Sequence, residues 1–354
     1  MALRALVGIA LLLCSFLGGV AGHRWWVLQR YVDAGDPREA LYFWNYDPPQ
    51  SPPNVARSAR LLREYLVTRD VMTLRTAREG FASAVAGECP GSRVPALMWL
   101  SDYFLTPTDL QAQMLENPEG ARMLTWLASK GFVPLRDLLT EVETRQIDLP
   151  RPNGMKPDVE IMASLLSDAG PTRAGWDAAD DVVRCLGLRP GDSVADLHSG
   201  VGFWAYRLAR AVGPGGAAYA VGEKASMVDF VRAMASAEGL SNLQSVMGKK
   251  GDVALLPQSL SCAFVCGYFC DLYGREPLAV RASWVESVKR ALRPGGTLAV
   301  MDSNVQVSGA LPCIGNRISR WVVIADLTSR GFRFKRCYEL TPQRYVLLFE
   351  RGAS

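Results

Sequence analysis

The chain contains very little histidine: only His23 and His198 occur among its 354 residues. This scarcity excludes a histidine-rich metal centre, and it excludes any mechanism that needs two catalytic histidines in one site. We therefore expect no metal ion. The net charge is also small, because the 39 basic side chains are nearly balanced by 35 acidic ones, and both kinds are spread along the chain. Without a basic patch, the sequence gives no indication of a nucleic-acid partner.

Cysteine is present, but without the spacing of a disulfide framework or a CxxC metal site. Cys262, Cys266 and Cys270 recur every four residues in an apolar stretch that is typical of a strand. This spacing places Cys262 and Cys266 on one strand face, where we expect them to be buried thiols. The absence of a framework favours a reducing compartment.

Charge is missing altogether from residues 5–22, which form an apolar run near the start of the chain. Its length is near the lower limit for crossing a bilayer core of about 30 Å. We interpret the run as a membrane anchor, with the main domain on the cytoplasmic side because Arg24, Arg30 and Arg38 follow it. The alternative is a secretory signal that is cleaved after small residues at 19–22, followed by export.

Two proline-rich breaks divide the rest of the chain, one at residues 47–54 and one at 149–154. Between them, apolar residues recur at helical spacing, and Asn117-Pro118 is typical of a helix start that Gly131 would follow as a stop. The sequence therefore predicts four parts: a hydrophobic segment at 1–22, a linker at 23–54, a small helical module at 55–150 and a larger domain at 151–354.

Strand and helix patterns alternate from about residue 180 onward, which predicts an α/β fold with a doubly wound, mainly parallel sheet. The first five expected strands are 193–197, 217–221, 243–247, 262–266 and 297–302, and the last two, 332–338 and 345–350, form a closing hairpin. The expected helices are 204–212, 225–238, 284–292 and 318–330, and residues 293–296 are expected to form a turn.

A glycine-rich turn follows the first expected strand, and ligands of such folds bind beyond the carboxyl ends of the strands. Gly200 and Gly202 allow the backbone to turn tightly, and the helix that follows offers free N–H groups to an anion. Because Gly200-x-Gly202-x-x-Ala205 also fits a dinucleotide fingerprint, a nicotinamide-binding protein is one alternative. A turn without any ligand is another.

Four motifs in order extend this pattern: Leu188–Asp192, the turn from Asp196 to Gly202, Gly251-Asp252 before Leu256-Pro257, and Leu292–Gly296. Together they resemble the class I S-adenosylmethionine-dependent methyltransferases over residues 156–351. The resemblance implies a Rossmann-like, seven-stranded sheet whose last strand is antiparallel, and S-adenosylmethionine as the cofactor. In this family the methyl group is already activated, so the protein mainly aligns a nucleophile and excludes water.

The resemblance also assigns cofactor-binding positions. Asp196 would help to hold the methionine part, and the backbone at Gly200 and Gly202 would pass close to it. Asp252 matches the acid that contacts the adenine amino group, and Glu223 stands one residue late for the acid that holds the ribose. A strand offset of one residue turns a side chain to the opposite face, so Glu223 can serve only if the chain bends there.

Several residues depart from the family pattern at this crevice. His198 takes the place of the first glycine of the turn, where an imidazole needs an unusual backbone angle and occupies cofactor space. The remaining departures are Gly222 for the ribose acid, Ser261-Cys262 for the Asp that begins the fourth strand, and Gly267 and Cys270-Asp271 at its end. A His198→Gly and Gly222→Asp double change should therefore raise cofactor affinity if these departures weaken binding.

Two functional hypotheses follow. The first is S-adenosylmethionine-dependent methyl transfer to an unidentified acceptor by a membrane-anchored protein. In that case His198 is a candidate general base, and Tyr268 and Asp271 stand where relatives place substrate-facing residues. The second is a non-catalytic methyltransferase-fold protein that acts as a structural or interaction module. His198 is then a packed or capping residue, and Tyr268 and Asp271 are ordinary loop residues. Under either hypothesis the helical module is expected to select the substrate or partner.

Overall fold

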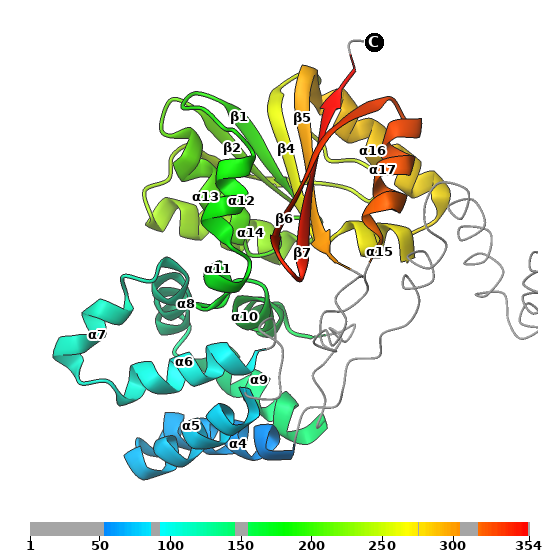
Figure 1. The fold of residues 1–354 in the computed structure, drawn as a ribbon. Helices are drawn as coiled ribbons and strands as arrows, with labels where there is room; N and C mark the ends of the chain where they lie inside the picture. The colour runs from blue at the N-terminus through cyan, green and yellow to red at the C-terminus, as the bar shows by residue number, and fades with distance from the viewer. Residues whose placement is uncertain (1–52, 86–92, 146–154, 275, 305–317, 353–354) are drawn as a thin grey trace, which may run out of the picture.

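The computed structural model describes residues 53–85, 93–145, 155–274, 276–304 and 318–352. A sheet flanked by helices forms one half of the molecule, and a group of helices lies against one end of it (Figure 1). The expected hydrophobic segment, the linker up to residue 52 and the break at 149–154 lie outside the described residues. None of the helices that the structure describes has the length and apolar character required to span a membrane.

The helical module forms where the apolar periodicity predicts it. Asn117 caps its fifth helix by accepting a hydrogen bond from the Gly120 backbone N–H at 2.8 Å, and Pro118 occupies the first turn. Gly131 follows in a left-handed conformation, as expected of a helix stop. The helices of the module are α4 (Pro53–Thr68), α5 (Val71–Val85), α6 (Val94–Leu105), α7 (Thr108–Met114), α8 (Pro118–Ser129) and α9 (Val133–Arg145).

Seven strands form one mixed sheet in the order β3-β2-β1-β4-β5-β7-β6. β7 is antiparallel to both of its neighbours, which confirms the expected antiparallel last strand. The strands are β1 (Ser193–Leu197), β2 (Ala217–Gly222), β3 (Leu243–Met247), β4 (Leu260–Cys266), β5 (Leu292–Ser303), β6 (Phe332–Thr341) and β7 (Arg344–Arg351).

Helices cover both faces of the sheet, as in doubly wound folds (Figure 1). Val194 of β1 belongs to the buried cluster on one face, whereas Ala195 and Leu197 belong to the cluster on the other. This alternation places Asp196 on the same face as Val194. The first face carries α12 (Ala179–Cys185), α13 (Phe203–Val212) and α14 (Ala225–Ala237), and the second carries α15 (Phe269–Gly274), α16 (Leu278–Ala291) and α17 (Arg320–Ser329).

β5 begins at Leu292, before the expected turn at residues 293–296, so this strand is longer than predicted. Leu292 pairs with Leu260, and Thr297 pairs with Cys262, so a bulge takes up the additional residues. Gly295 adopts a φ of +74°, which fits a bulge within the strand. The short helix α15 was also not predicted.

Two further helices, α10 (Pro157–Ser167) and α11 (Arg173–Trp176), lead from the module to the sheet. They lie beneath the carboxyl ends of the parallel strands, the end where ligands of this fold bind (Figure 1). These two helices therefore lie between the module and the functional edge of the sheet.

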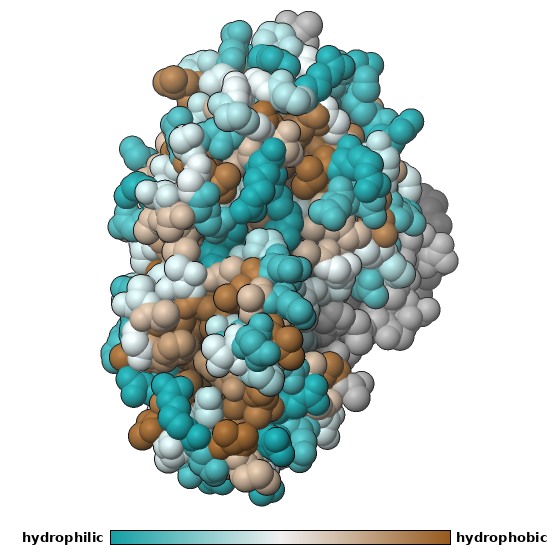
Figure 2. Space-filling model, turned by 90° about the vertical axis from the view of Figure 1, so that its left-hand side faces the viewer, coloured by the Kyte–Doolittle hydropathy of each residue, from teal (hydrophilic) through white to brown (hydrophobic). Residues whose placement is uncertain are grey.

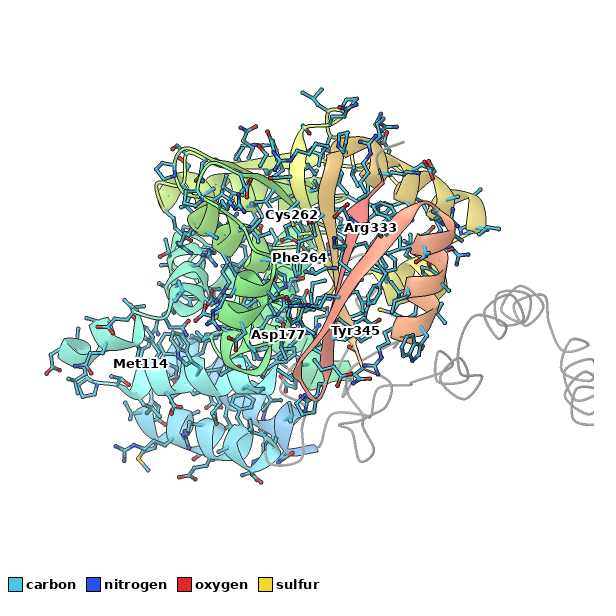
Figure 3. The ribbon with its side chains drawn as sticks, turned by 45° about the horizontal axis from the view of Figure 1, so that its top comes forward. Met114, Asp177, Cys262, Phe264, Arg333 and Tyr345 are labelled. Atoms are coloured by element: carbon cyan, nitrogen blue, oxygen red, sulfur yellow. The ribbon has the colours of Figure 1, made fainter. Side chains whose placement is uncertain are left out.

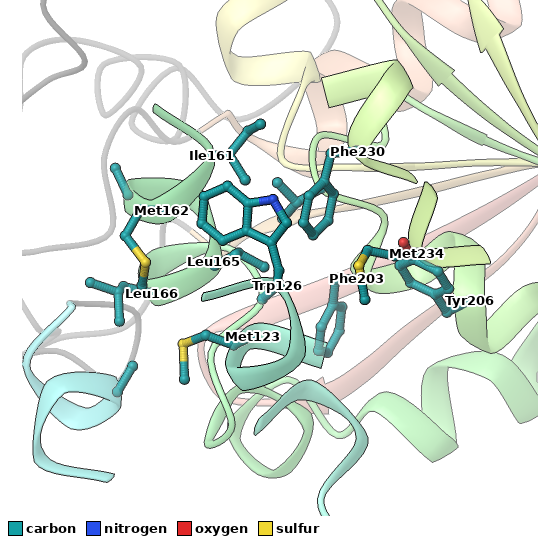
Figure 4. Close-up of a cluster of buried hydrophobic side chains, with 14 of the residues drawn as sticks. Met123, Trp126, Ile161, Met162, Leu165, Leu166, Phe203, Tyr206, Phe230 and Met234 are labelled. Atoms are coloured by element: carbon teal, nitrogen blue, oxygen red, sulfur yellow. The ribbon is translucent and has the colours of Figure 1, made fainter. Parts of the chain in front are cut away.

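The module and the sheet domain are also joined through α8, which packs on α13 and α14. Trp126 meets Phe230 edge-to-face at 5.8 Å between ring centroids (Figure 4). The Arg122 guanidinium lies 3.6 Å from the centre of the Tyr206 ring and forms an ion pair with Glu238. One continuous cluster of buried apolar residues extends from the module to this face of the sheet. The two parts consequently share a core.

Candidate functional site

The expected cofactor turn lies at the carboxyl end of β1, where left-handed backbone angles bend the chain toward α13. His198, Gly200 and Gly202 have φ values of +68°, +54° and +85°. The Ser199 N–H donates to the Val221 carbonyl oxygen at 2.8 Å, and the Gly202 N–H donates to the Ser199 carbonyl oxygen at 2.8 Å. The two glycines thus have the conformations that the sequence predicts, while His198 adopts an angle that histidine rarely takes.

Tyr268 fills the part of the crevice that the resemblance assigns to adenosine. Its ring stacks on His198 with centroids 4.3 Å apart and planes 19° apart, and it also contacts Trp284 at 5.4 Å. Tyr268 and Trp284 are buried, whereas His198 is exposed on the outer side of the stack. The cavity that remains between these side chains and β2 has a volume of about 10 Å³. This volume is close to the space that a single water molecule requires.

Glu223, the candidate ribose-binding acid, contacts this same tyrosine. Tyr268 and Glu223 line the same small cavity. Burial raises the pKa of Tyr268, and the nearby Glu223, Glu276 and Asp271 carboxylates raise it further. Tyr268 therefore keeps its proton, and its ring lies beside the acid proposed for the ribose.

Asp252, the candidate adenine-binding acid, lies at the rim of the small cavity. Its Oδ1 accepts a hydrogen bond from the Ala254 N–H at 3.1 Å and forms an ion pair with Arg290 at 3.0 Å. Both side chains of this pair are about half exposed. The carboxylate is therefore shared with a surface arginine.

Asp196, the candidate acid for the methionine part, is buried at the end of β1 with 2% of its surface exposed. Burial raises the pKa of Asp196 to about 7, against the opposing effects of Arg173 and of the Ala205 N–H. Within the described part of the chain, no donor reaches its Oδ2 atom. This carboxyl is the least satisfied polar group at the predicted cofactor positions.

Arg173 of α11 reaches into the same part of the crevice. Its guanidinium lies 4.3 Å from the centre of the Phe203 ring, and its Nη2 lies 3.7 Å from the Cys266 sulfur. Nη1 donates to the Asp168 carbonyl oxygen, and Nε pairs with Asp177 at 2.9 Å. The guanidinium therefore lies among the ends of β1 and β4 and the start of α13.

Asp177 connects this arginine to the start of β7; Figure 3 labels Asp177 and Tyr345, the second residue of that strand. It is fully buried, and its Oδ1 pairs with the Nε atom of Arg344, the first residue of β7, at 3.0 Å. The Arg344 Nη1 atom also donates to the Ser303 hydroxyl at 2.9 Å. Burial raises the pKa of the neighbouring Asp302 to about 6. One carboxylate thus joins two arginines that are distant in the sequence.

The sequence did not indicate Arg173, Asp177 or Arg344 as site residues. The four-residue spacing of Arg173 and Asp177 is the usual pattern of an ion pair on a solvated helix face. Asp271, expected near the substrate, lies in the first turn of α15. Among the described residues, no group of three His, Cys, Asp or Glu side chains could hold a metal ion.

A larger cavity of about 450 Å³ lies in the helical module, between the first turns of α9 and α10. Its charged side chains form ion pairs, Lys130 with Asp158 at 3.0 Å and Lys156 with Asp137 at 2.9 Å. It is formed by elements other than the glycine turn.

The strand order, the glycine turn and the acid after β3 together define a methyltransferase-type domain. Residues 158–311 match the model of the ubiE/COQ5 methyltransferase family. This match confirms the resemblance of this part of the chain to the class I S-adenosylmethionine-dependent methyltransferases, and S-adenosylmethionine is the cofactor of that family.

Solved structures with a related fold include a SAM-dependent methyltransferase from Aquifex aeolicus. It is 23% identical, with a TM-score of 0.48, and the match covers 56% of this chain and 99% of that one. Another is geranyl diphosphate C-methyltransferase from Streptomyces coelicolor A3(2), at 15% identity and a TM-score of 0.42, covering 57% of this chain and 83% of that one.

The crevice of this chain does not fit the family cofactor as its side chains are arranged. Ligand pockets usually have volumes of about 300–1,000 Å³. Here His198 and Tyr268 leave about 10 Å³ on the adenosine side, and on the methionine side the Arg173 guanidinium lies over the Phe203 ring next to the glycine turn. The backbone of the turn follows the family pattern, while side chains of the chain itself occupy the space above it.

Proposed function

We propose that this chain is a non-catalytic methyltransferase-fold protein that acts as a structural or interaction module. The observation that supports this proposal is the closed adenosine half of the crevice, where Tyr268 stacks on His198 and a cavity of only about 10 Å³ remains beside Glu223. The departures at Gly222 and Ser261 point the same way, because both remove acids that are usual in the family. Ser261 instead fastens β1 to β4 through hydrogen bonds with the Ser193 backbone at 2.8 and 3.0 Å.

The helical module is the candidate interaction surface of this proposal. Apolar side chains gather on the lower part of the face shown in Figure 2, which the module forms. The large apolar side chains of the module that are at least 38% exposed are Val67, Val71, Met72, Leu110, Leu115 and Val133. Exposed apolar surface of this kind is typical of protein contact sites.

Methyl transfer from S-adenosylmethionine to an unidentified acceptor is the second candidate function. It is favoured by the buried Oδ2 atom of Asp196, which is unsatisfied among the described residues, and by the space beside Gly200, where an added Cβ would meet nothing within 4 Å. Methyl transfer would require Tyr268 and Arg173 to leave the crevice.

Isothermal titration of the full chain with S-adenosylmethionine and S-adenosylhomocysteine separates the two candidates. We expect no heat of binding at high micromolar ligand, and no cofactor released from the purified protein in mass spectrometry after denaturation. Saturable binding, or cofactor carried through purification, would overturn the non-catalytic proposal in favour of methyl transfer.

The His198→Gly and Gly222→Asp double variant is the matched partner in this titration. It removes the outer ring of the stack and returns an acid to the end of β2. A Cβ atom at position 222 would lie 3.2 Å from the Val228 side chain, so that side chain has to shift slightly. We expect weak but measurable cofactor binding by the variant if the departures from the family pattern are what close the crevice. Unchanged affinity would contradict that explanation.

We also propose that residues 5–22 attach the protein to a membrane, with the main domain on the cytoplasmic side. The absence of charge in this segment and the arginines that follow it support the assignment. Alkaline extraction of membranes should leave the full chain in the pellet, and protease added outside intact, sealed cells should spare it. Release of a shortened chain outside the cell would indicate a cleaved signal instead.

A further inference from the structure

The Arg173 side chain lies at the methionine half of the crevice, and the proposed function gives it no role. Arg173 comes from α11, outside the sheet, and its side chain is only 12% exposed. Its guanidinium lies over the Phe203 ring at 4.3 Å, next to the glycine turn. Cation–π contacts of this geometry stabilise a guanidinium that has left water.

The groups around Arg173 supply an acceptor for each nitrogen of its guanidinium group, as a binding site for a cation would. Asp177 supplies a fully buried carboxylate at 2.9 Å, and the Asp168 carbonyl oxygen and the Cys266 sulfur accept from the other two nitrogens. The Asp196 carboxyl lies close enough for the arginine to affect its titration. These contacts involve every nitrogen of the guanidinium group.

We propose that the Arg173 guanidinium is a built-in cation that occupies the methionine half of the crevice and fastens α11 across the ends of β1 and β4. This inference deepens the proposed function, because it assigns a second internal occupant to the same crevice. It also explains why Asp177 is paired twice. Through Arg344, the carboxylate that holds the cation is itself tied to the start of β7. A cavity with these contacts, once emptied, should accept a small guanidinium compound and should not accept a neutral one of similar shape.

Chemical rescue of an Arg173→Ala variant of the full chain tests this inference. The variant loses a buried ion-pair partner, and we expect its Tm to fall by roughly 5–10 °C. Ethylguanidinium chloride at low millimolar concentration should restore at least half of the loss in a saturable manner. Equal concentrations of sodium chloride and of ethylurea are the controls for ionic strength and for shape without charge.

Arg184→Ala is the matched control variant, because Arg184 pairs with Asp181 while its side chain is 75% exposed. Its Tm should change by less than roughly 2 °C, and ethylguanidinium should have no specific effect on it or on the wild type. An Arg173→Lys variant keeps the charge but loses the forked geometry, so its Tm should lie between those of wild type and Arg173→Ala. It also supplies the measurement if the alanine variant fails to fold.

The inference is overturned if Arg173→Ala is as stable as the wild type, or if ethylguanidinium raises the Tm of all variants equally. If the alanine variant does not fold, it is overturned when Arg173→Lys is as stable as the wild type. These outcomes leave the non-catalytic proposal standing, since that proposal depends on the adenosine half. Conversely, cofactor binding by the wild type would overturn both proposals, because the cofactor and the Arg173 side chain cannot share the methionine half.

Discussion

The two halves of the crevice are closed by different kinds of interaction. On the adenosine side, the stack of His198 on Tyr268 faces solvent at its outer ring, and Glu223 at its edge is also exposed. On the methionine side, a buried carboxylate joins two largely buried arginines, Arg173 and Arg344. Aromatic pairs contribute about 0.5–1.5 kcal/mol beyond the area they bury, whereas breaking a buried ion pair costs about 3–5 kcal/mol.

This difference indicates that the two sides constrain the protein unequally. On the adenosine side, the exposed His198 ring can rotate away from the buried Tyr268 ring with little effect on the rest of the fold. The methionine side cannot open without separating α11 from the sheet and leaving charges without partners. The conformational stability of the crevice should therefore depend mainly on the charged side.

Asp177→Ala should produce the largest effect, because it removes the carboxylate that both Arg173 and Arg344 contact. Two largely buried cations would remain close together with no shared counter-charge. We expect a loss of about 3–5 kcal/mol in the free energy of unfolding, measured by urea denaturation. Asp181→Ala is the control, because that carboxylate is half exposed in its pair with Arg184, and it should cost at most about 1 kcal/mol. Equal losses in the two variants would contradict the comparison.

Asp196→Asn should have an intermediate effect that depends on pH. In the folded protein, burial raises the pKa of Asp196 to about 7, against about 3.9 in an unfolded chain. The folded state therefore holds the proton more tightly, and this contribution to stability is present below pH 4 and is lost as the pH rises to 7. Asparagine does not ionise, so the variant does not lose stability at this position as the pH rises. Relative to wild type, it should gain on the order of 1–3 kcal/mol between pH 4 and pH 8.

The measurement is urea denaturation of both proteins across that pH range. Asp229→Asn is the control, because Asp229 is 67% exposed in its pair with Arg232 and should leave the pH profile unchanged. Asp302, whose pKa burial raises to about 6, contributes a slope of the same sign in both proteins and cancels from the difference. A profile for Asp196→Asn that is parallel to that of the wild type would show that Asp196 is ionised in the folded state.

Sequence patterns predicted the elements whose signals are local. β1 begins at Ser193 and ends at Leu197 as expected, because a turn motif precedes this apolar run and a glycine turn follows it. The glycine turn itself was predictable, since left-handed backbone angles favour glycine. The turn expected at residues 293–296 corresponds to a bulge within β5, because pairing with β4 at Leu292 and again at Thr297 makes these residues part of the strand.

The sequence did not predict how side chains close the crevice, although it identified His198 as a residue that would occupy cofactor space. Whether an imidazole at that position stacks on Tyr268 depends on a ring from a different strand end. The charged side depends on even more distant contacts, because Asp177 and Arg344 are 167 residues apart and meet only when the sheet is complete. Neither residue differs from a surface charge in its local sequence, so burial alone identifies it.

His198→Gly should have the smallest effect and is the most direct test of the weaker side. Glycine adopts the observed φ of +68° without strain, which recovers about 1 kcal/mol, while loss of the ring stack costs about 0.5–1.5 kcal/mol. We expect the free energy of unfolding to change by less than about 1 kcal/mol in urea. His198→Ala is the matched variant: it loses the same stack but keeps the strained angle, and it should be about 1 kcal/mol less stable than the glycine variant. A loss above about 2 kcal/mol in His198→Gly would mean that the exposed ring holds the adenosine side closed as firmly as the buried charges hold the other.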